Sequence, residues 1–137
     1  MINKIDHIGI AVKNLTVAIP KFNLLLGTEP YKTEIVDSEK VSTVFYKVGD
    51  CKIELLCPTS KESTIYKFLE KKGEGIHHIA FDVYGIQKSL DFYASGGINL
   101  IHNQPKIGAD KKEIAFLHPK DTLGVLIELC ADLINDK

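Results

Sequence analysis

Two histidines and two glutamates stand out because each recurs in similar surroundings. His7 lies in the segment KIDHIGIAV, and His78 lies in GIHHIAFDV, 71 residues further on (78 − 7). Glu54 lies in CKIELLC, and Glu128 lies in VLIELCA, 74 residues further on (128 − 54). Imidazole nitrogens and carboxylate oxygens together suit borderline or hard divalent cations. We therefore predict that these four side chains bind one divalent metal ion.

The immediate neighbours of the two glutamates are apolar on both sides. Glu54 stands between Ile53 and Leu55, and Glu128 stands between Ile127 and Leu129. A buried carboxylate in such a strand costs several kcal/mol unless a cation, an ion-pair partner or water compensates it. For either glutamate alone, a strand face open to solvent is the better explanation. The recurrence of both glutamates together with equivalent histidines favours the metal site.

The two matches occur in the same order, which indicates a duplicated unit. Each copy changes from strand-like to helix-like and back to strand-like periodicity, in the order β-α-β-β-β. At 137 residues the chain has the size of one compact domain. We therefore expect a single domain over residues 1–137, made of an N-terminal module at 1–60, a linking helix at 61–74 and a C-terminal module at 75–137.

The expected elements follow from turn and capping residues as well as from periodicity. In the first module Asn14 is a candidate N-cap and Gly27 a candidate helix stop. The expected strands of this module lie at 7–12, 31–36, 41–48 and 51–57. In the second module we expect a helix at 86–94 and strands near 98–102, 113–117 and 125–130. The core of the linking helix is expected at 63–71.

Composition and charge narrow the classes of partner. The net charge is −1, 45% of the residues are hydrophobic and 26% are charged, which is ordinary for a globular protein. No broad basic field is present, so we expect neither nucleic acid nor a membrane as partner. A small molecule is the better expectation. The first residues carry no apolar leader segment and no run is long enough to span a membrane, so we expect a cytoplasmic protein.

The remaining reactive residues have simpler interpretations. Three cysteines without C-x-x-C spacing favour reduced thiols over a disulfide framework or a thiolate zinc site. His77 should point away from the face of His78 and be structural or exposed. His102 and His118 lie near strand ends and are expected in solvent, although His118 could line a pocket mouth. The pairs at 71–72 and 111–112 are lysines expected on solvated faces.

A duplicated β-α-β-β-β unit with one histidine and one glutamate ligand per copy resembles the vicinal-oxygen-chelate superfamily, which has the glyoxalase fold. The segments IDHIGIAVKNL, KIELLCP, KFLEKKGEGIHHIAFDV and IAFLHPKDTLGVLIEL resemble the methylmalonyl-CoA epimerase family. The resemblance implies an α+β fold in which two modules form a curved mixed sheet around a metal. It also implies a homodimer that acts on an acyl-CoA and interconverts (R)- and (S)-methylmalonyl-CoA. Co²⁺ is the first choice of metal, with Mn²⁺, Ni²⁺, Zn²⁺ and Mg²⁺ as alternatives.

Inverting one carbon without an organic cofactor requires a proton to leave on one face and return on the other, and therefore two acid/base groups. The resemblance implies that Glu128 is one of them, in addition to being a ligand. The second is a glutamate in the loop before the third strand, where many relatives read PEQGV. Here residues 37–41 read DSEKV. Strict alignment places Ser38 at the base position and Glu39 one residue later, and we take Glu39 as the base.

Other members of the superfamily remain as alternatives. Some epimerases carry glutamine where this chain has Glu54, and a His-Glu-His-Glu ligand set also resembles bacterial glyoxalase I. A glyoxalase I-like isomerase is therefore the second candidate. A binding protein that sequesters a small molecule on the same fold is the third, although it would not need four ligands. A ring-cleaving dioxygenase fits least, because it uses a two-histidine, one-carboxylate iron site.

Overall fold

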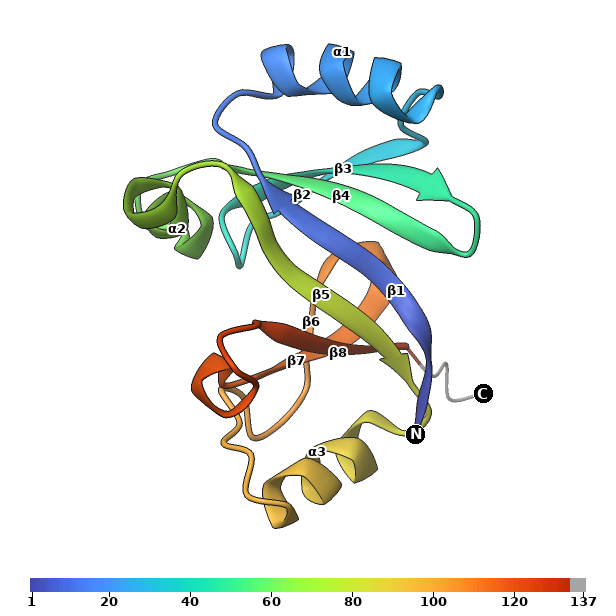
Figure 1. Cartoon of the computed structure of the whole chain (residues 1–137), viewed down its shortest axis with the longest axis vertical. Coiled ribbons are helices and arrows are strands. Elements are labelled where there is room, and N and C mark those ends of the chain that lie inside the picture. Colours follow the sequence, from blue (N-terminus) through green and yellow to red (C-terminus); the bar gives the residue numbers. More distant parts are fainter. Residues whose placement is uncertain (134–137) are drawn as a thin grey trace. The chain divides into compact units, whose positions relative to one another are not determined.

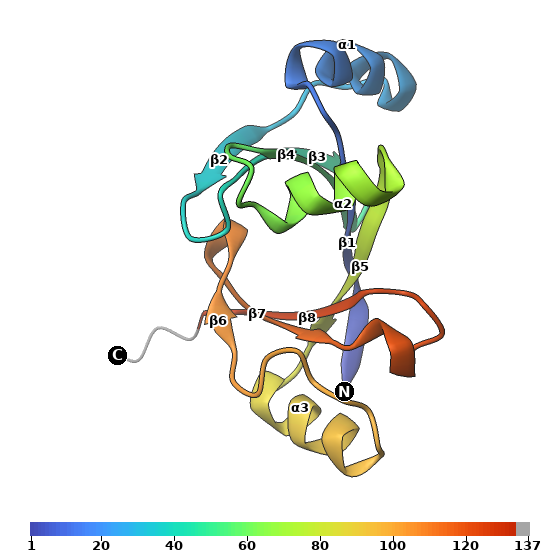
Figure 2. The same cartoon turned by 90° about the vertical axis from the view of Figure 1, so that its left-hand side faces the viewer.

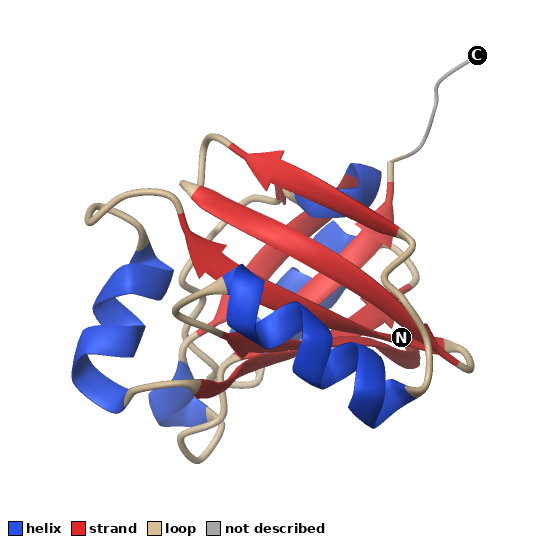
Figure 3. Ribbon diagram, turned by 90° about the horizontal axis from the view of Figure 1, so that it is seen from above, coloured by secondary structure: helices blue, strands red, loops and turns tan. Residues whose placement is uncertain are grey.

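The computed structural model describes residues 1–133, so the last four residues of the predicted C-terminal module lie outside the described residues. Helices and strands are mixed along the chain, as expected for an α+β protein (Figure 3). The elements in chain order (Figure 1) are β1 (Ile2–Ala11), α1 (Leu15–Leu26), β2 (Lys32–Val36), β3 (Val41–Val48), β4 (Cys51–Pro58), α2 (Thr64–Lys72), β5 (Gly75–Val83), α3 (Ile86–Ser95), β6 (Lys106–Ile107), η1 (Ala109–Lys111), β7 (Lys112–Leu117), η2 (Pro119–Asp121) and β8 (Ile127–Asp132).

Backbone contacts group the chain into two compact units. The N-unit comprises residues 7–77, and the C-unit comprises residues 1–6 together with the chain from residue 78 onward. The boundaries cut strands β1 and β5 rather than loops. The chain therefore passes from one unit to the other at the Asp6–His7 and His77–His78 peptide bonds.

In the N-unit the strands follow the order β2-β3-β4-β1. β3 is antiparallel to both β2 and β4, and β1 is parallel to β4. Helix α1 covers one face of these strands, where Phe22 packs with Tyr46 and Leu55 (Figure 1). The hydroxyl of Tyr46 also donates a hydrogen bond to Oδ1 of Asn23, at 2.7 Å. This face is the main apolar core of the N-unit.

Helix α2 packs on the opposite face of the N-unit, near the carboxyl end of β4 (Figure 2). Ile65 and Leu69 of α2 contact Leu56 of β4 in one buried cluster. Successive strand residues point to opposite faces, so Glu54 shares the face of Leu56 whereas Leu55 points toward α1. The sheet pattern therefore places Glu54 on the face that α1 does not cover.

The C-unit repeats this arrangement with the strand order β5-β8-β7-β6. β5 is parallel to β8, and β7 is antiparallel to its neighbours. Leu90 of α3 packs against Leu117 and Leu129 in a buried core. The first residues of β1 belong here as well, because Asn3 donates a hydrogen bond to Asp82, at 2.9 Å.

Helix capping confirms the boundaries that the sequence predicts for α1. The Asn14 side chain accepts a hydrogen bond from the Thr16 backbone N–H at 2.9 Å, and the helix ends at Gly27 with φ of 68°. This left-handed conformation favours glycine, because glycine lacks a Cβ atom. Within the segment expected to link the two modules, helix α2 begins after the N-cap Ser63 and ends at Lys72.

The prediction of a strand at 98–102 is wrong. This segment forms an isolated bridge, between Leu100 and Leu117, and the strand that pairs with β7 on the side away from β8 is the two-residue β6. The side chain of Asp121 accepts hydrogen bonds from both nitrogens of Asn99 and holds the segment locally. Pro105, which lacks a backbone N–H, comes directly before β6. The segment still makes two backbone hydrogen bonds in this region, from Ile101 N–H to the Phe116 carbonyl at 2.9 Å and from His118 N–H to the Asn99 carbonyl at 2.8 Å, without forming a regular strand.

None of the helices in residues 1–133 is long and apolar enough to cross a membrane.

Candidate metal centre

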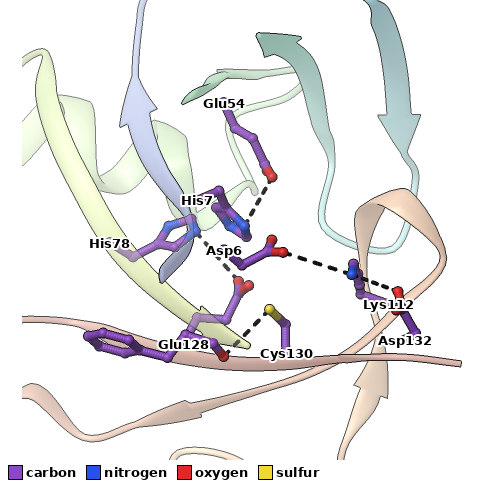
Figure 4. A network of polar contacts seen from close by, with 9 residues as sticks. Asp6, His7, Glu54, His78, Lys112, Glu128, Cys130 and Asp132 are labelled. Carbon is purple, nitrogen blue, oxygen red and sulfur yellow. Dashed lines mark hydrogen bonds and ion pairs between the residues drawn. The ribbon is translucent and has the colours of Figure 1, made fainter. Parts of the chain in front are cut away.

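In the N-unit, His7 and Glu54 form a buried pair. Nδ1 of His7 lies 3.1 Å from Oε2 of Glu54, and both side chains are less than one-tenth exposed (Figure 4). The strand ladder explains this proximity, because Glu54 is directly opposite Gly9, two residues after His7 on the same face of β1. On its other side Glu54 is opposite Phe45 of β3. Two of the four predicted ligands are therefore adjacent.

In the C-unit, His78 and Glu128 form the equivalent pair. Nε2 of His78 lies 3.5 Å from Oε1 of Glu128, and both side chains are again almost fully buried (Figure 4). Glu128 is opposite Ala80, two residues after His78 on β5, and on its other side it is opposite Phe116 of β7. The other two predicted ligands are therefore adjacent as well.

The same register in both units confirms that the sequence repeat reflects a structural repeat. In each unit a glutamate has a phenylalanine opposite it on one neighbouring strand and a small residue opposite it on the other. The histidine stands two positions before that small residue. The small residue, glycine in one unit and alanine in the other, leaves space beside the carboxylate. Each unit thus carries a histidine and a glutamate at equivalent positions of its strands.

The distances within each pair fit a shared cation. Two ligand atoms about 2.1 Å from an ion, at angles between about 90° and 110°, lie roughly 3.0–3.4 Å apart. The separation of 3.1 Å in the N-unit lies within this range, and that of 3.5 Å in the C-unit lies just above it. The donor set, one imidazole and one carboxylate per pair, contains no thiolate and suits Co²⁺, Mn²⁺, Ni²⁺, Zn²⁺ or Mg²⁺. The buried histidine and glutamate residues thus indicate a metal site.

Glu39 and Ser38 lie in the turn between β2 and β3, in the N-unit. Glu39 is partly buried whereas Ser38 is exposed. The turn is held by the backbone carbonyl of Lys40, which accepts a hydrogen bond from Thr59 N–H at 2.9 Å, and by an ion pair between Lys40 and Glu62. The turn that carries the predicted second base is therefore fixed to the loop after β4.

A charge network in the C-unit, which joins the largely buried Lys112 and Asp6 to the exposed Asp132, was not predicted from the sequence. Lys112 Nζ lies 2.6 Å from Asp132 and 3.8 Å from the buried Asp6 (Figure 4). The expectation that Lys112 belongs to a solvated face is wrong, since only 14% of its side chain is exposed. Period-2 alternation offers the one available signal, because residues 112, 114 and 116 share a face of β7 and Ile114 is buried there.

The other histidines and the cysteines have structural contacts. His77 packs edge-on against Phe68 at 4.9 Å, and burial, with a smaller contribution from Lys72, lowers its pKa to about 4. His102 accepts a hydrogen bond from the Phe116 backbone N–H and is partly buried, so the expectation that it lies in solvent is wrong. His118 is exposed and caps the turn η2. All three cysteines are free thiols.

Known proteins are similar to this chain in both sequence and fold. The family model of the glyoxalase/bleomycin resistance protein/dioxygenase superfamily matches residues 6–116. The uncharacterized protein YqjC of Bacillus subtilis is 41% identical over 93% of this chain and 91% of its own length. The ethylmalonyl-CoA/methylmalonyl-CoA epimerase of Cereibacter sphaeroides is 38% identical over 94% of this chain and 98% of its own length.

A solved structure extends the similarity to three dimensions. The structure of a methylmalonyl-CoA epimerase in complex with methylmalonyl-CoA and NH4+ superposes with a TM-score of 0.89 at 33% identity, and covers 96% of both chains. The predicted fold and resemblance are therefore confirmed. The chain belongs to the glyoxalase/bleomycin resistance protein/dioxygenase superfamily, within which it is similar to methylmalonyl-CoA epimerases.

Proposed function

We propose that this protein is a metal-dependent methylmalonyl-CoA epimerase, which interconverts the (R) and (S) forms by moving a proton at the carbon between the thioester and the carboxylate. The observation that carries this proposal is the buried histidine–glutamate pair found at the same register position in both units. Similarity to epimerases along more than nine-tenths of the chain supports the choice of substrate.

In this proposal the two pairs, His7 with Glu54 and His78 with Glu128, bind one divalent ion. Two ligands alone would leave such an ion largely hydrated, whereas four leave two positions of an octahedral shell for a substrate. Each histidine is also bonded directly to a residue of the other unit, at Asp6–His7 and His77–His78. This covalent arrangement supports a single shared ion. Co²⁺ is the first candidate among the ions that suit these ligands.

The bound ion would supply positive charge that stabilises the enolate oxygen as the α-proton leaves. The remaining steps belong to the protein. The Glu128 carboxylate accepts the proton on one face of the substrate, and Glu39, protonated as the carboxylic acid, donates a proton to the carbon on the other face and becomes the carboxylate. Only 4% of Glu128 is exposed, so bulk solvent has little access to its carboxylate. The partly buried position of Glu39, in contrast to exposed Ser38, supports the assignment of the second base to Glu39.

The test is exchange of the substrate α-hydrogen with solvent. We expect the Co²⁺-loaded protein to incorporate deuterium from D₂O into methylmalonyl-CoA, and the chelator-treated protein to lose this activity until the ion is restored. Glu39→Gln should bind the ion as the wild type does and lose about 10²–10⁴-fold in epimerisation, because it lacks one proton carrier. Ser38→Ala is the matched control in the same turn and should retain activity.

Two outcomes would contradict the proposal. Turnover of the glutathione–methylglyoxal hemithioacetal, with no exchange in the thioester, would replace the epimerase with a glyoxalase I-like isomerase. An inactive protein that binds a small molecule without exchange would make it a binding protein of the same fold. Full activity in Glu39→Gln would reject Glu39 as the second base while leaving the reaction in place.

A further inference from the structure

Three aromatic rings of the C-unit lie in a row that ends on a predicted metal ligand. The His78 ring packs edge-on against the Phe116 ring, with 5.6 Å between the centroids and an interplanar angle of 86°. The Phe116 ring also contacts the His102 ring, at 5.7 Å and 55°. His102 comes from the irregular segment before β6, whereas His78 lies on β5. Phe116 therefore connects this segment to the histidine–glutamate pair.

Hydrogen bonds to the backbone of β7 hold the His102 ring in place. β6 pairs with β7 at Glu113 and Ile114, so Phe116 lies beyond the end of that pairing. There the carbonyl of Phe116 accepts a hydrogen bond from Ile101 N–H at 2.9 Å, and the N–H of Phe116 donates one to Nδ1 of His102 at 3.2 Å. The His102 side chain thus replaces a neighbouring strand as the acceptor for this N–H. A ring fixed at both its backbone and its side chain limits how its neighbour Phe116 can move.

The surroundings of Phe116 restrain its ring less than those of its equivalent in the N-unit. Phe45 is fully buried, and its ring contacts the Tyr31 ring at 5.9 Å and the Lys32 ammonium group at 4.8 Å. Phe116 is partly exposed and contacts two imidazoles instead. Close packing on all sides holds a side chain in one rotamer, and a partly exposed ring has less of it. The fixed ring of His102 therefore has more influence on the orientation of Phe116.

The orientation of the His78 ring matters because an imidazole binds a metal ion through a nitrogen lone pair that lies in the ring plane. Nε2 of His78 lies 3.5 Å from Oε1 of Glu128, the other predicted ligand of this unit. An edge-on aromatic neighbour resists rotation of the imidazole about its bond to Cβ. Binding geometry must be held within about 10–20° to be effective. Removing a group that orients a ligating histidine typically weakens metal binding by about 10–100-fold.

We infer that His102 is a positioning residue for the metal site, which acts through Phe116 to hold the His78 imidazole in the orientation that binds the ion. This inference rests on the metal site of the proposed function, and it does not depend on the identity of the substrate. It also gives the irregular segment at 98–102 a role, because that segment carries the outermost ring of the row.

Co²⁺ affinity, measured by competition with a chelator, tests this inference without reference to turnover. His102→Asn retains an oxygen that can accept the hydrogen bond from Phe116 N–H, so the variant should fold, but it lacks the ring. We expect it to bind Co²⁺ about tenfold more weakly and to shift the visible absorption bands of the bound ion. Asn103→Ala changes an exposed neighbour in the same segment and is the matched control, which should stay within about twofold of wild type.

A double-mutant cycle tests whether the effect passes through Phe116. Phe116→Leu should itself weaken Co²⁺ binding, because it removes the ring that contacts His78. Adding His102→Asn to Phe116→Leu should then change the affinity by less than about twofold, since the connecting ring is already absent. Additive losses would show that His102 acts by another route and would overturn the inference.

The remaining outcomes separate this inference from the proposed function. If the wild type binds Co²⁺ but exchanges no deuterium into methylmalonyl-CoA, the epimerase proposal fails while Co²⁺ affinity still tests the role of His102. Lower stability of His102→Asn in urea, with unchanged Co²⁺ affinity and absorption, would assign His102 a purely structural role and overturn the inference. An equal loss of affinity in Asn103→Ala, or no binding of Co²⁺ to the wild type, would overturn it as well.

Discussion

The two units hold the same three side-chain types in the same register but surround them differently. In the N-unit the Phe45 ring lies under the Lys32 ammonium group, 4.8 Å from the ring centroid. In the C-unit the equivalent Phe116 ring contacts two imidazoles instead, His78 at 5.6 Å and His102 at 5.7 Å. The backbone frame has thus been kept after duplication while the neighbours of the site have diverged.

The divergence extends to the charges of each unit. The N-unit carries the exposed Lys13 and Lys61 near the end of β4, in contact with solvent. The C-unit instead encloses Lys112 between Asp6 and Asp132, where the charges compensate one another. The two copies therefore keep an equivalent histidine–glutamate pair and differ in the charges around it. Pairwise comparison of equivalent residues should reveal where the symmetry ends.

The largest difference in deuterium exchange rate is expected between substitutions of the two glutamates that we propose as ligands. Glu128→Gln should lower the deuterium exchange rate by about 10²–10⁴-fold, because it removes a proton carrier as well as a charged ligand. Glu54→Gln retains an oxygen that can coordinate the ion, so it should weaken metal affinity with a smaller loss of exchange. Metal content by mass spectrometry and exchange by NMR measure both effects. Equal losses of exchange at saturating metal would mean that the two carboxylates have equivalent roles.

Substitutions in the two apolar cores are expected to cause a moderate and nearly equal loss of stability. Leu55 and Leu129 follow the two glutamates directly, and each is fully buried against the helix of its own unit. Leu55→Ala and Leu129→Ala should each lower the free energy of unfolding by about 2–5 kcal/mol, through lost burial and a cavity. Urea denaturation followed by circular dichroism measures both. A cost below about 1 kcal/mol for one variant alone would show that the core of that unit is less tightly packed.

The smallest loss of stability is expected from substitutions at the N-termini of the helices. The N-cap Asn14 satisfies a backbone N–H of α1, whereas α3 begins after Gly85 with no side-chain cap. Asn14→Ala should lower the free energy of unfolding by about 1 kcal/mol. Thr16→Ala is the control, since it retains both the cap and the backbone donor, and should change stability by less than about 0.5 kcal/mol. Equal losses in the two variants would point to a general effect of substitution in this turn rather than to the cap.

The sequence predicted the features that depend on local periodicity and on the repeat. The pairing of His7 with Glu54, and of His78 with Glu128, followed from matching segments whose strands adopt one register. The burial of Lys112 could not be predicted in this way, because its acidic partners come from distant positions in the chain. The irregular segment at 98–102 was missed for a related reason, since its contacts, a single bridge to Leu117 and the hydrogen bonds from Asn99 to Asp121, are made to residues distant in the chain.

The point at which the chain changes unit has a consequence for any attempt to divide this protein. Residues 1–6 complete the C-unit although they belong to the first copy of the repeat, and residues 73–77 remain with the N-unit although they lead into the second. A half-length polypeptide cut between the copies would therefore keep one histidine–glutamate pair but lose part of its own sheet, leaving unpaired strand hydrogen-bonding groups at an edge. Such a fragment should therefore associate with a second copy of itself through that edge.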